Sequence, residues 1–145
     1  MHILPRLEQF PGQARDVIRY GDLDPQGHVN NTVFATYFET GRVMLLREPS
    51  RLLSPAGVTS VLARLDISFL REMHWPGEVT IGTATTRIGR SSYTFLQAIF
   101  QDGQCAATAD ATMVMIDMQT RKARPIPEEA AARLQALRLR VANGG

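Results

Sequence analysis

The sequence is poor in cysteine and lysine and has no long hydrophobic run. Its 145 residues include one cysteine, Cys105, and one lysine, Lys122. A single cysteine excludes an intrachain disulfide and any metal centre built on several thiolates. No uncharged stretch approaches the roughly 18 apolar residues of a membrane span, and the N-terminus has no basic start followed by an apolar run. We therefore expect a cytoplasmic protein without a membrane partner.

Over most of the chain neither sign of charge is in large excess. The sequence has 16 basic and 14 acidic residues, a net charge of +2. Residues 1–120 hold 10 basic and 12 acidic side chains and residues 121–145 hold 6 and 2, so the positive excess lies in the C-terminal tail. Without a basic stripe, nucleic acid is not an expected partner. The length predicts a single domain over residues 1–145.

A helical period follows residue 31. Apolar residues and one glycine recur there at spacings of three and four: Phe34, Tyr37, Phe38, Gly41 and Leu45. Pro49 prevents continuation beyond residue 48, which predicts a helix over 31–48, about 25 Å long. Its wide apolar arc predicts that the helix is largely enclosed. Gly41 in its middle indicates a close approach of the sheet.

Most of the remaining chain alternates as strands. They are expected at 15–20, 60–69, 79–88, 93–101 and 105–118. Asp102-Gly103 is a two-residue hairpin signal. A helix is expected from Pro127, with a stripe of Ala130, Leu134, Leu137 and Val141. One strand, a helix, four strands in a meander and a peripheral C-terminal helix predict an α+β fold, with a curled antiparallel sheet wrapped around the central helix.

The segment between the first strand and the helix carries the most chemistry. Asp22 and Asp24 lie in a turn-rich loop, and His28 precedes the helix start at Asn31. The first N–H groups of a helix lack internal acceptors, so they can hold a developing oxyanion. A nearby carboxylate can activate water as a general base or attack an acyl group itself. Turn formation and helix capping explain the same residue types, so both interpretations stay open here.

This segment resembles the signature of the hotdog-fold thioesterases, the 4-hydroxybenzoyl-CoA thioesterase-like group. The matching positions are Asp22, Asp24, Gly27, Phe34, Tyr37, Phe38, Glu39 and Arg42. Segments 66–71, 75–78 and 88–92 are similar to less specific elements of the family, and the resemblance spans roughly residues 15–127. It implies a hotdog fold and the hydrolysis of an acyl thioester.

The resemblance also implies roles for single residues. Asp24 becomes the catalytic carboxylate, the backbone N–H of Asn31 becomes the oxyanion donor, and Asp22 becomes structural. Glu39 and Arg42 are expected to form a buried orienting pair, since a contact between helical residues three apart is allowed.

His28 heads a His-Val-Asn-Asn stretch that is similar to acyl-carrier-protein thioesterases of this fold, in which a histidine and an asparagine assist the aspartate. Gln26 stands where that asparagine would be. The carrier, coenzyme A or acyl carrier protein, therefore stays open. Two alternative functions stay open too. One is a hotdog enoyl-CoA hydratase, whose histidine follows the proline by two residues, whereas His28 follows Pro25 by three. The other is a non-catalytic domain that binds acyl-CoA.

Arginine-rich turns are expected to contact the phosphates of coenzyme A. The expected substrate-binding residues are Arg90, Ser91, Ser92, Arg121, Lys122 and Arg124. In the family the acyl pocket runs beside the helix, commonly at a subunit interface, which implies a homodimer or homotetramer. The resemblance implies no metal and no cofactor beyond the coenzyme A of the substrate.

Overall fold

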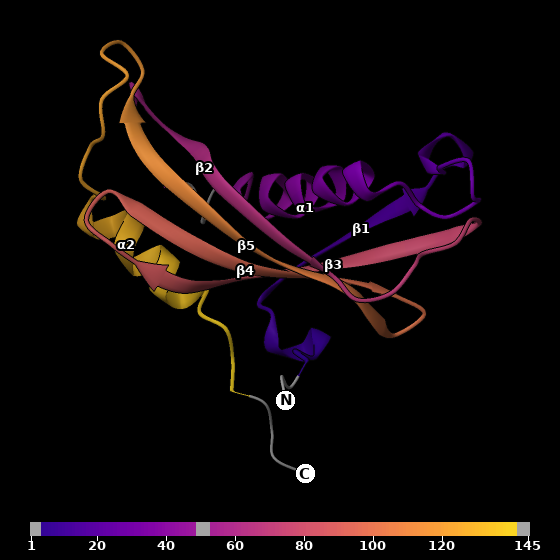
Figure 1. The fold of residues 1–145 in the computed structure, drawn as a ribbon. Coiled ribbons are helices and arrows are strands. Elements are labelled where there is room, and N and C mark those ends of the chain that lie inside the picture. The colour runs from indigo at the N-terminus through magenta and orange to yellow at the C-terminus, as the bar shows by residue number, and fades with distance from the viewer. Residues whose placement is uncertain (1–3, 49–52, 142–145) are drawn as a thin grey trace.

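A curled antiparallel sheet carries one long helix in the hollow of its curl (Figure 1). The computed structural model describes residues 4–48 and 53–141. Its strands are β1 (Gly12–Ile18), β2 (Val58–Phe69), β3 (Gly77–Ile88), β4 (Ser92–Gln101) and β5 (Gln104–Asp117), and its helices are α1 (Asn31–Leu46) and α2 (Glu128–Ala136). The predicted α+β arrangement is confirmed. The first strand differs from prediction, because it begins at residue 12 and residues 20–22 form a 3₁₀ turn.

The strand order is β1-β3-β4-β5-β2. The predicted four-strand meander is therefore wrong in one respect: β3, β4 and β5 form a meander, but β2 lies at the far edge beside β5. Eleven residue pairs, from Val58–Asp117 to Phe69–Ala107, join β2 to β5. In a meander β2 would pair with β3 on the side away from β4, but β1 pairs with β3 there.

Helix α1 presents its apolar side to the sheet and packs against β1, β3 and β4. Its buried residues are Phe34, Tyr37, Phe38, Gly41, Arg42 and Leu45. The helix ends at Leu46, two residues before the predicted limit. The prediction that the helix is largely enclosed is wrong for this chain, because Val43 and Met44 on its outer side are 57% and 45% exposed.

Gly41 lies where α1 comes closest to the sheet, as predicted. A Cβ atom at this position would lie 2.5 Å from Ile81 Cγ2 and 3.0 Å from Gln97 Nε2. Gln97 is fully buried on β4 and joins the two layers: its Nε2 donates to the carbonyl of Phe38 at 2.9 Å, and its Oε1 accepts from Arg42 Nη1 at 3.0 Å.

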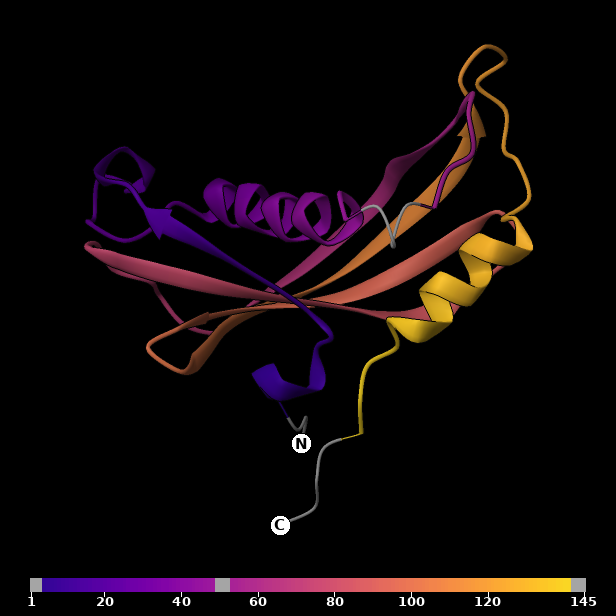
Figure 2. The ribbon, with the colours of Figure 1, turned by 180° about the vertical axis from the view of Figure 1, so that it is seen from behind.

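The β4–β5 hairpin turns at Asp102 and Gly103, both with positive φ, which confirms the predicted two-residue turn. Helix α2 packs against β3, away from α1 (Figure 2). It ends earlier than predicted, because the chain after Leu137 pairs with β3: the amide of Thr85 donates to Leu137 and that of Leu139 donates to Thr85. Val141, expected on the buried stripe, is 91% exposed.

Within residues 4–48 and 53–141, neither helix has the length and apolar character needed to cross a bilayer.

Candidate active site

The loop that follows β1 is tied to α1 through Asp22. Its Oδ2 accepts hydrogen bonds from the hydroxyl of Tyr37 at 2.7 Å and from the amide of Arg19 at 2.9 Å. Burial, together with the hydrogen bond to Asp22, raises the pKa of Tyr37 well above its usual range, so this hydroxyl stays protonated and continues to donate. The carboxylate of Asp22 is thus engaged in holding the loop.

Asp24 closes the next turn, over residues 24–28, with hydrogen bonds from its side chain and its backbone. Its Oδ1 accepts from the amides of Gln26 at 2.9 Å and His28 at 3.2 Å, and its own amide donates to the carbonyl of His28 at 2.8 Å. Gly27 completes the turn at a φ of +85°, in the region that favours glycine. Both side-chain bonds go to Oδ1. Among the described residues Oδ2 has no hydrogen-bond partner, so it is available to a ligand.

Helix α1 begins directly after this turn. Asn30 is the N-cap, and its Oδ1 accepts from the amide of Thr32 at 3.0 Å. Its backbone carbonyl accepts from the amide of Val33 at 2.9 Å. Asn31 is the first helical residue, so its N–H has no acceptor within the helix. The capping bonds therefore leave the Asn31 amide as the donor at the positive end of the helix dipole.

The imidazole of His28 is turned toward Glu72 and His74 and not toward Asp24. Its Nε2 lies 3.1 Å from Glu72 Oε2, and its ring meets that of His74 edge to face at 5.2 Å. The hydrogen bond between His28 and Asp24 uses the backbone amide. His28 therefore positions the carboxylate through its main chain, and its side chain lies beside the Asp24 turn.

Asp24, His28 and Asn31 line one hollow of about 330 Å³ between the start of α1 and the end of β2. Gln26, Val29 and Phe34 line its near side, and Phe69, Leu70, Arg71 and Glu72 line its far side. The residues that carry the free carboxylate oxygen and the first helical amide thus line the same space. This combination can bind a carbonyl group and deliver a base or nucleophile to it.

The sequence profile of the Thioesterase-like superfamily matches residues 18–134, which include this loop and every strand after it. The chain belongs to this superfamily. Comparison with curated protein sequences gives no significant match.

Solved structures of similar proteins confirm the hotdog fold. The PA5185 protein of Pseudomonas aeruginosa PAO1 shares 25% identity with a TM-score of 0.82, over 93% of this chain and 96% of that protein. A thioesterase of Thermus thermophilus, complexed with coenzyme A and Zn, shares 33% identity with a TM-score of 0.75, over 90% and 96% of the two chains. The DHNA-CoA thioesterase of Staphylococcus aureus has the same fold at 23% identity, with a TM-score of 0.75 and coverage of 87% and 91%.

The two arginine-rich turns of this thioesterase-like chain lie side by side. The amide of Met115 donates to the carbonyl of Ser91, and that of Ile126 donates to the carbonyl of Arg90. We call the six predicted phosphate contacts, Arg90, Ser91, Ser92, Arg121, Lys122 and Arg124, the basic corner. Arg124 also pairs with Asp117 at 3.6 Å. Backbone amides of Thr120 and Gln119, with Arg124 as a lesser contributor, lower the pKa of Asp117.

The basic corner lies at the opposite end of the sheet from Asp24. Strand β3 begins opposite the end of β1, next to the Asp24 loop, and Ile88 at its other end pairs with Tyr93 near the corner. The 16 residues of α1 span the same direction, which is about 24 Å. Within one chain the predicted catalytic and phosphate-binding residues are therefore not brought together.

Glu39 and Arg42 do not form the predicted buried pair. Arg42 is buried, but Glu39 is exposed, and the hydrogen bond of the guanidinium goes to Gln97. Burial lowers the pKa of Arg42, and the charge of Glu39 opposes that shift. The orienting partner of Arg42 comes from β4, which spacing along the helix could not indicate.

Sequence reasoning missed the residues that β2 and the segment after it bring to α1. Besides the hollow at Asp24, a more apolar groove of about 500 Å³ lies between α1 and β2, with Val43, Leu46, Leu53, Leu62 and Met113 in its lining. We call the stretch between these two hollows, flanked by α1 and by β2 from Phe69 to Leu62, the α1–β2 seam. The alternating apolar pattern of 60–69 was the available signal, but it did not show which element that face meets.

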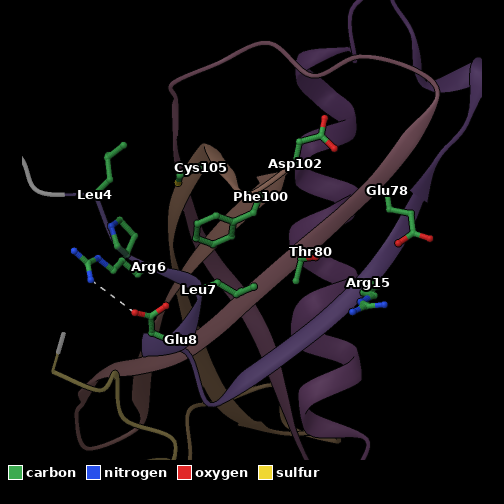
Figure 3. Close-up of a pocket in the computed structure, with 12 residues that line it drawn as sticks. Leu4, Arg6, Leu7, Glu8, Arg15, Glu78, Thr80, Phe100, Asp102 and Cys105 are labelled. Atoms are coloured by element: carbon green, nitrogen blue, oxygen red, sulfur yellow. Dashed lines mark ion pairs between the residues drawn. The ribbon is translucent and has the colours of Figure 1, made fainter. Parts of the chain in front are cut away.

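A third hollow, of about 810 Å³, lies on the sheet face opposite α1 (Figure 3). Arg6, Glu8, Arg15 and Glu78 surround it with charges of both signs, and Cys105 lies at its edge. Burial raises the pKa of the Cys105 thiol, which disfavours the nucleophilic thiolate. None of the predicted catalytic residues lines this hollow.

Proposed function

We propose that the chain hydrolyses an acyl-CoA thioester, with Asp24 as general base or nucleophile and the Asn31 amide as oxyanion donor. The supporting observation is that Asp24, whose Oδ2 has no hydrogen-bond partner among the described residues, and Asn31, the first residue of α1, line one hollow of about 330 Å³. Membership of the Thioesterase-like superfamily favours this chemistry over hydration or binding alone.

In the proposed reaction the thioester carbonyl oxygen lies at the Asn31 N–H. As a base, Asp24 takes a proton from a water whose oxygen forms the new bond to the carbonyl carbon. The negative charge that develops on the carbonyl oxygen is stabilised by the amide and the helix dipole. The C–S bond then breaks, the thiolate takes up a proton, and the acid leaves. As a nucleophile, Asp24 would form an anhydride that water hydrolyses to the same products.

Coenzyme A is the proposed carrier. The Thermus thermophilus thioesterase, 33% identical over 90% of this chain, is complexed with coenzyme A. The acyl group would extend from Asp24 along the α1–β2 seam into the apolar groove near Leu62 and Leu46. The phosphates would reach either Arg71, which lines the Asp24 hollow, or the basic corner. Because the basic corner lies at the opposite end of the sheet from Asp24, it can bind only the phosphates of an extended ligand, or those of a ligand in the Asp24 hollow of a second copy.

A homodimer or homotetramer belongs to this proposal. Apolar side chains on the seam and next to it are open in the single chain: Met44, Leu62, Phe69 and Leu70 are 42–50% exposed. A second copy over this face would enclose the acyl group. Sedimentation at several concentrations should give a species heavier than 16.1 kDa, and a purely monomeric protein would remove this part of the proposal.

The test is release of free thiol from short, medium, long and aromatic acyl-CoAs by the wild type and by Asp24→Asn. The asparagine Oδ1 can still accept the bonds from Gln26 and His28, so the loop is preserved. We expect at least about a hundredfold loss of kcat. Asp110→Asn, at an exposed position on β5, is the matched control and should keep wild-type activity.

Three outcomes would contradict the proposal. Absence of thiol release from every acyl-CoA would leave acyl carrier protein or a binding role, and unchanged turnover in Asp24→Asn would refute the site. Addition of water to an enoyl-CoA without thiol release would favour a hydratase. If hydrolysis is observed, a single turnover in ¹⁸O water followed by analysis of Asp24 separates the nucleophile from the base.

A further inference from the structure

Three potential metal ligands meet at the edge of the Asp24 hollow. His28, Glu72 and His74 each offer one donor atom, and these three atoms lie within 4.8 Å of one another. The closest pair, His28 Nε2 and Glu72 Oε2, is 3.1 Å apart. We call these three residues the His-Glu-His cluster. His28 and Glu72 are far apart in the chain, so no local spacing indicates the cluster.

The backbone places the three side chains on one side. His28 and His74 face each other in an antiparallel bridge, and residues that are directly opposite in such a pair point to the same side. Glu72 lies two residues before His74, so in an extended segment its side chain points to that side as well. Gln101 fixes this segment: its Oε1 accepts from the amide of His74 at 3.0 Å, and its Nε2 donates to the carbonyl at 2.7 Å.

Two imidazoles and one carboxylate form a donor set for Zn²⁺ and related divalent transition metals. Tetrahedral Zn²⁺ with ligands at about 2.0–2.2 Å separates its donor atoms by roughly 3.4 Å. The His28–Glu72 distance already fits. Glu72 and His74 are exposed, so rotation of their side chains can close the other separations. Three protein ligands leave one coordination position for water.

We infer that the His-Glu-His cluster binds one Zn²⁺ per chain, and that bound Zn²⁺ inhibits hydrolysis. Glu72 and His28 line the hollow that contains Asp24, so the ion would lie at the edge of the proposed active site. A dication there attracts the Asp24 carboxylate and weakens it as a base or nucleophile. Since the resemblance to thioesterases implies no metal for the reaction, the role proposed for the ion is inhibition. Inhibition rests on the proposed function, whereas binding does not.

The binding test uses Zn²⁺ alone, in competition with a chromophoric chelator, on wild type and three variants. We expect one Zn²⁺ per wild-type chain and at least about tenfold weaker binding by His74→Gln and Glu72→Gln. The sequence has three histidines, and the third, His2, lies outside the described residues. His2→Gln is therefore the matched control, and its affinity should equal that of the wild type.

A second measurement needs no variant. In the NMR spectrum of the wild type, two of the three histidine ring signals should shift when one equivalent of Zn²⁺ is added. Uptake of Zn²⁺ that moves only the His2 signal, or His74→Gln that binds as tightly as wild type, would overturn the site. Absence of binding at submillimolar Zn²⁺ would do the same.

The inhibition test compares thiol release with and without Zn²⁺. Wild type should lose activity as the site fills, whereas His74→Gln should keep its metal-free activity at the same Zn²⁺ concentration. Equal inhibition of the two proteins would overturn the inhibitory role. If neither protein hydrolyses any acyl-CoA, the proposed function fails, and the binding measurements still decide the site.

Discussion

The hydroxyl of Tyr37 donates a 2.7 Å hydrogen bond to Oδ2 of Asp22, and this bond joins the middle of α1 to the loop that carries Asp24. Tyr37 is fully buried, so its position is fixed by the core. The carbonyl of Asp22 in turn accepts from the amide of Asn30, the N-cap of α1. One aspartate thus sets the Asp24 turn relative to the helix start.

Tyr37→Phe should weaken both stability and catalysis. The change removes a hydrogen bond to a charged acceptor, which costs about 1–2 kcal/mol of unfolding free energy. The loop is then less well held, and we expect kcat to fall roughly tenfold, because small displacements of reacting groups are costly. Urea unfolding and thiol release measure the two effects. Tyr20→Phe, at an exposed position, is the control; a Tyr37→Phe protein that matches it would contradict the role.

Stability should fall in alkaline solution. Burial raises the pKa of Cys105, Tyr37 and Tyr93 in the folded chain. In the unfolded chain the thiol ionises near pH 8.5–9 and the phenols near pH 10. Above these values the unfolded state binds fewer protons than the folded state, so the unfolding free energy decreases as pH rises. Urea midpoints at about pH 7, 9 and 10.5 should decrease in that order, and the decrease should be smaller in Tyr37→Phe than in Tyr20→Phe. Equal midpoints at the lowest and highest pH would contradict this.

Gly41→Ala should destabilise the fold although alanine favours helices. The added Cβ would lie 2.5 Å from Ile81 Cγ2, which lies on a sheet strand and cannot move without disturbing the core. We expect a loss of about 1–3 kcal/mol of unfolding free energy, more than the helix propensity of alanine returns. Gly21→Ala is the matched control, since its added Cβ would have no atom of the described residues within 4 Å apart from its chain neighbours, and its effect should stay within about 0.5 kcal/mol.

The phosphate contacts can be assigned by comparing two substrates. If the basic corner binds the nucleotide, Arg121→Gln combined with Arg124→Gln should raise KM for an acyl-CoA roughly tenfold, the equivalent of about 1.4 kcal/mol. KM for the corresponding acyl-pantetheine, which lacks the phosphates, should not change. Arg71→Gln provides the comparison, because Arg71 lines the Asp24 hollow. If Arg71→Gln raises KM for acyl-CoA selectively and the double variant of the basic corner does not, the phosphates bind beside Arg71 instead.

Local sequence patterns predicted the elements well. The period of α1, the alternation of β2 and the Asp102-Gly103 turn depend on residues close together in the chain, and the structure confirms each. The order of strands in the sheet depends on long-range pairing, which alternation does not encode. For this reason a meander from β2 to β3 is the simplest expectation from the sequence, whereas β2 pairs with β5.

In the candidate site, too, the features set by nearby residues were predictable and the long-range contacts were not. Asp24, His28 and Asn31 lie close together in the chain, and a single turn and helix cap bring them to one hollow. Their roles stay predictions that the variants above test. The partners of His28 could not be predicted, because Glu72 and His74 reach it through a bridge between distant segments. Arg42 is a similar case, since its partner Gln97 lies 55 residues away.

Gln97 offers its amide to the carbonyl of Phe38 and to the hydroxyl of Thr83 while it accepts from Arg42, in an interface that is otherwise apolar. Apolar side chains tolerate sliding, but a shift of α1 by one turn would leave several polar groups buried without partners. The hydrogen bonds of Gln97 therefore oppose sliding of α1 along its axis. By preventing α1 from moving along its own axis, a residue in the middle of the sheet fixes where the helix start, and the loop tied to it through Asp22, stand along the sheet.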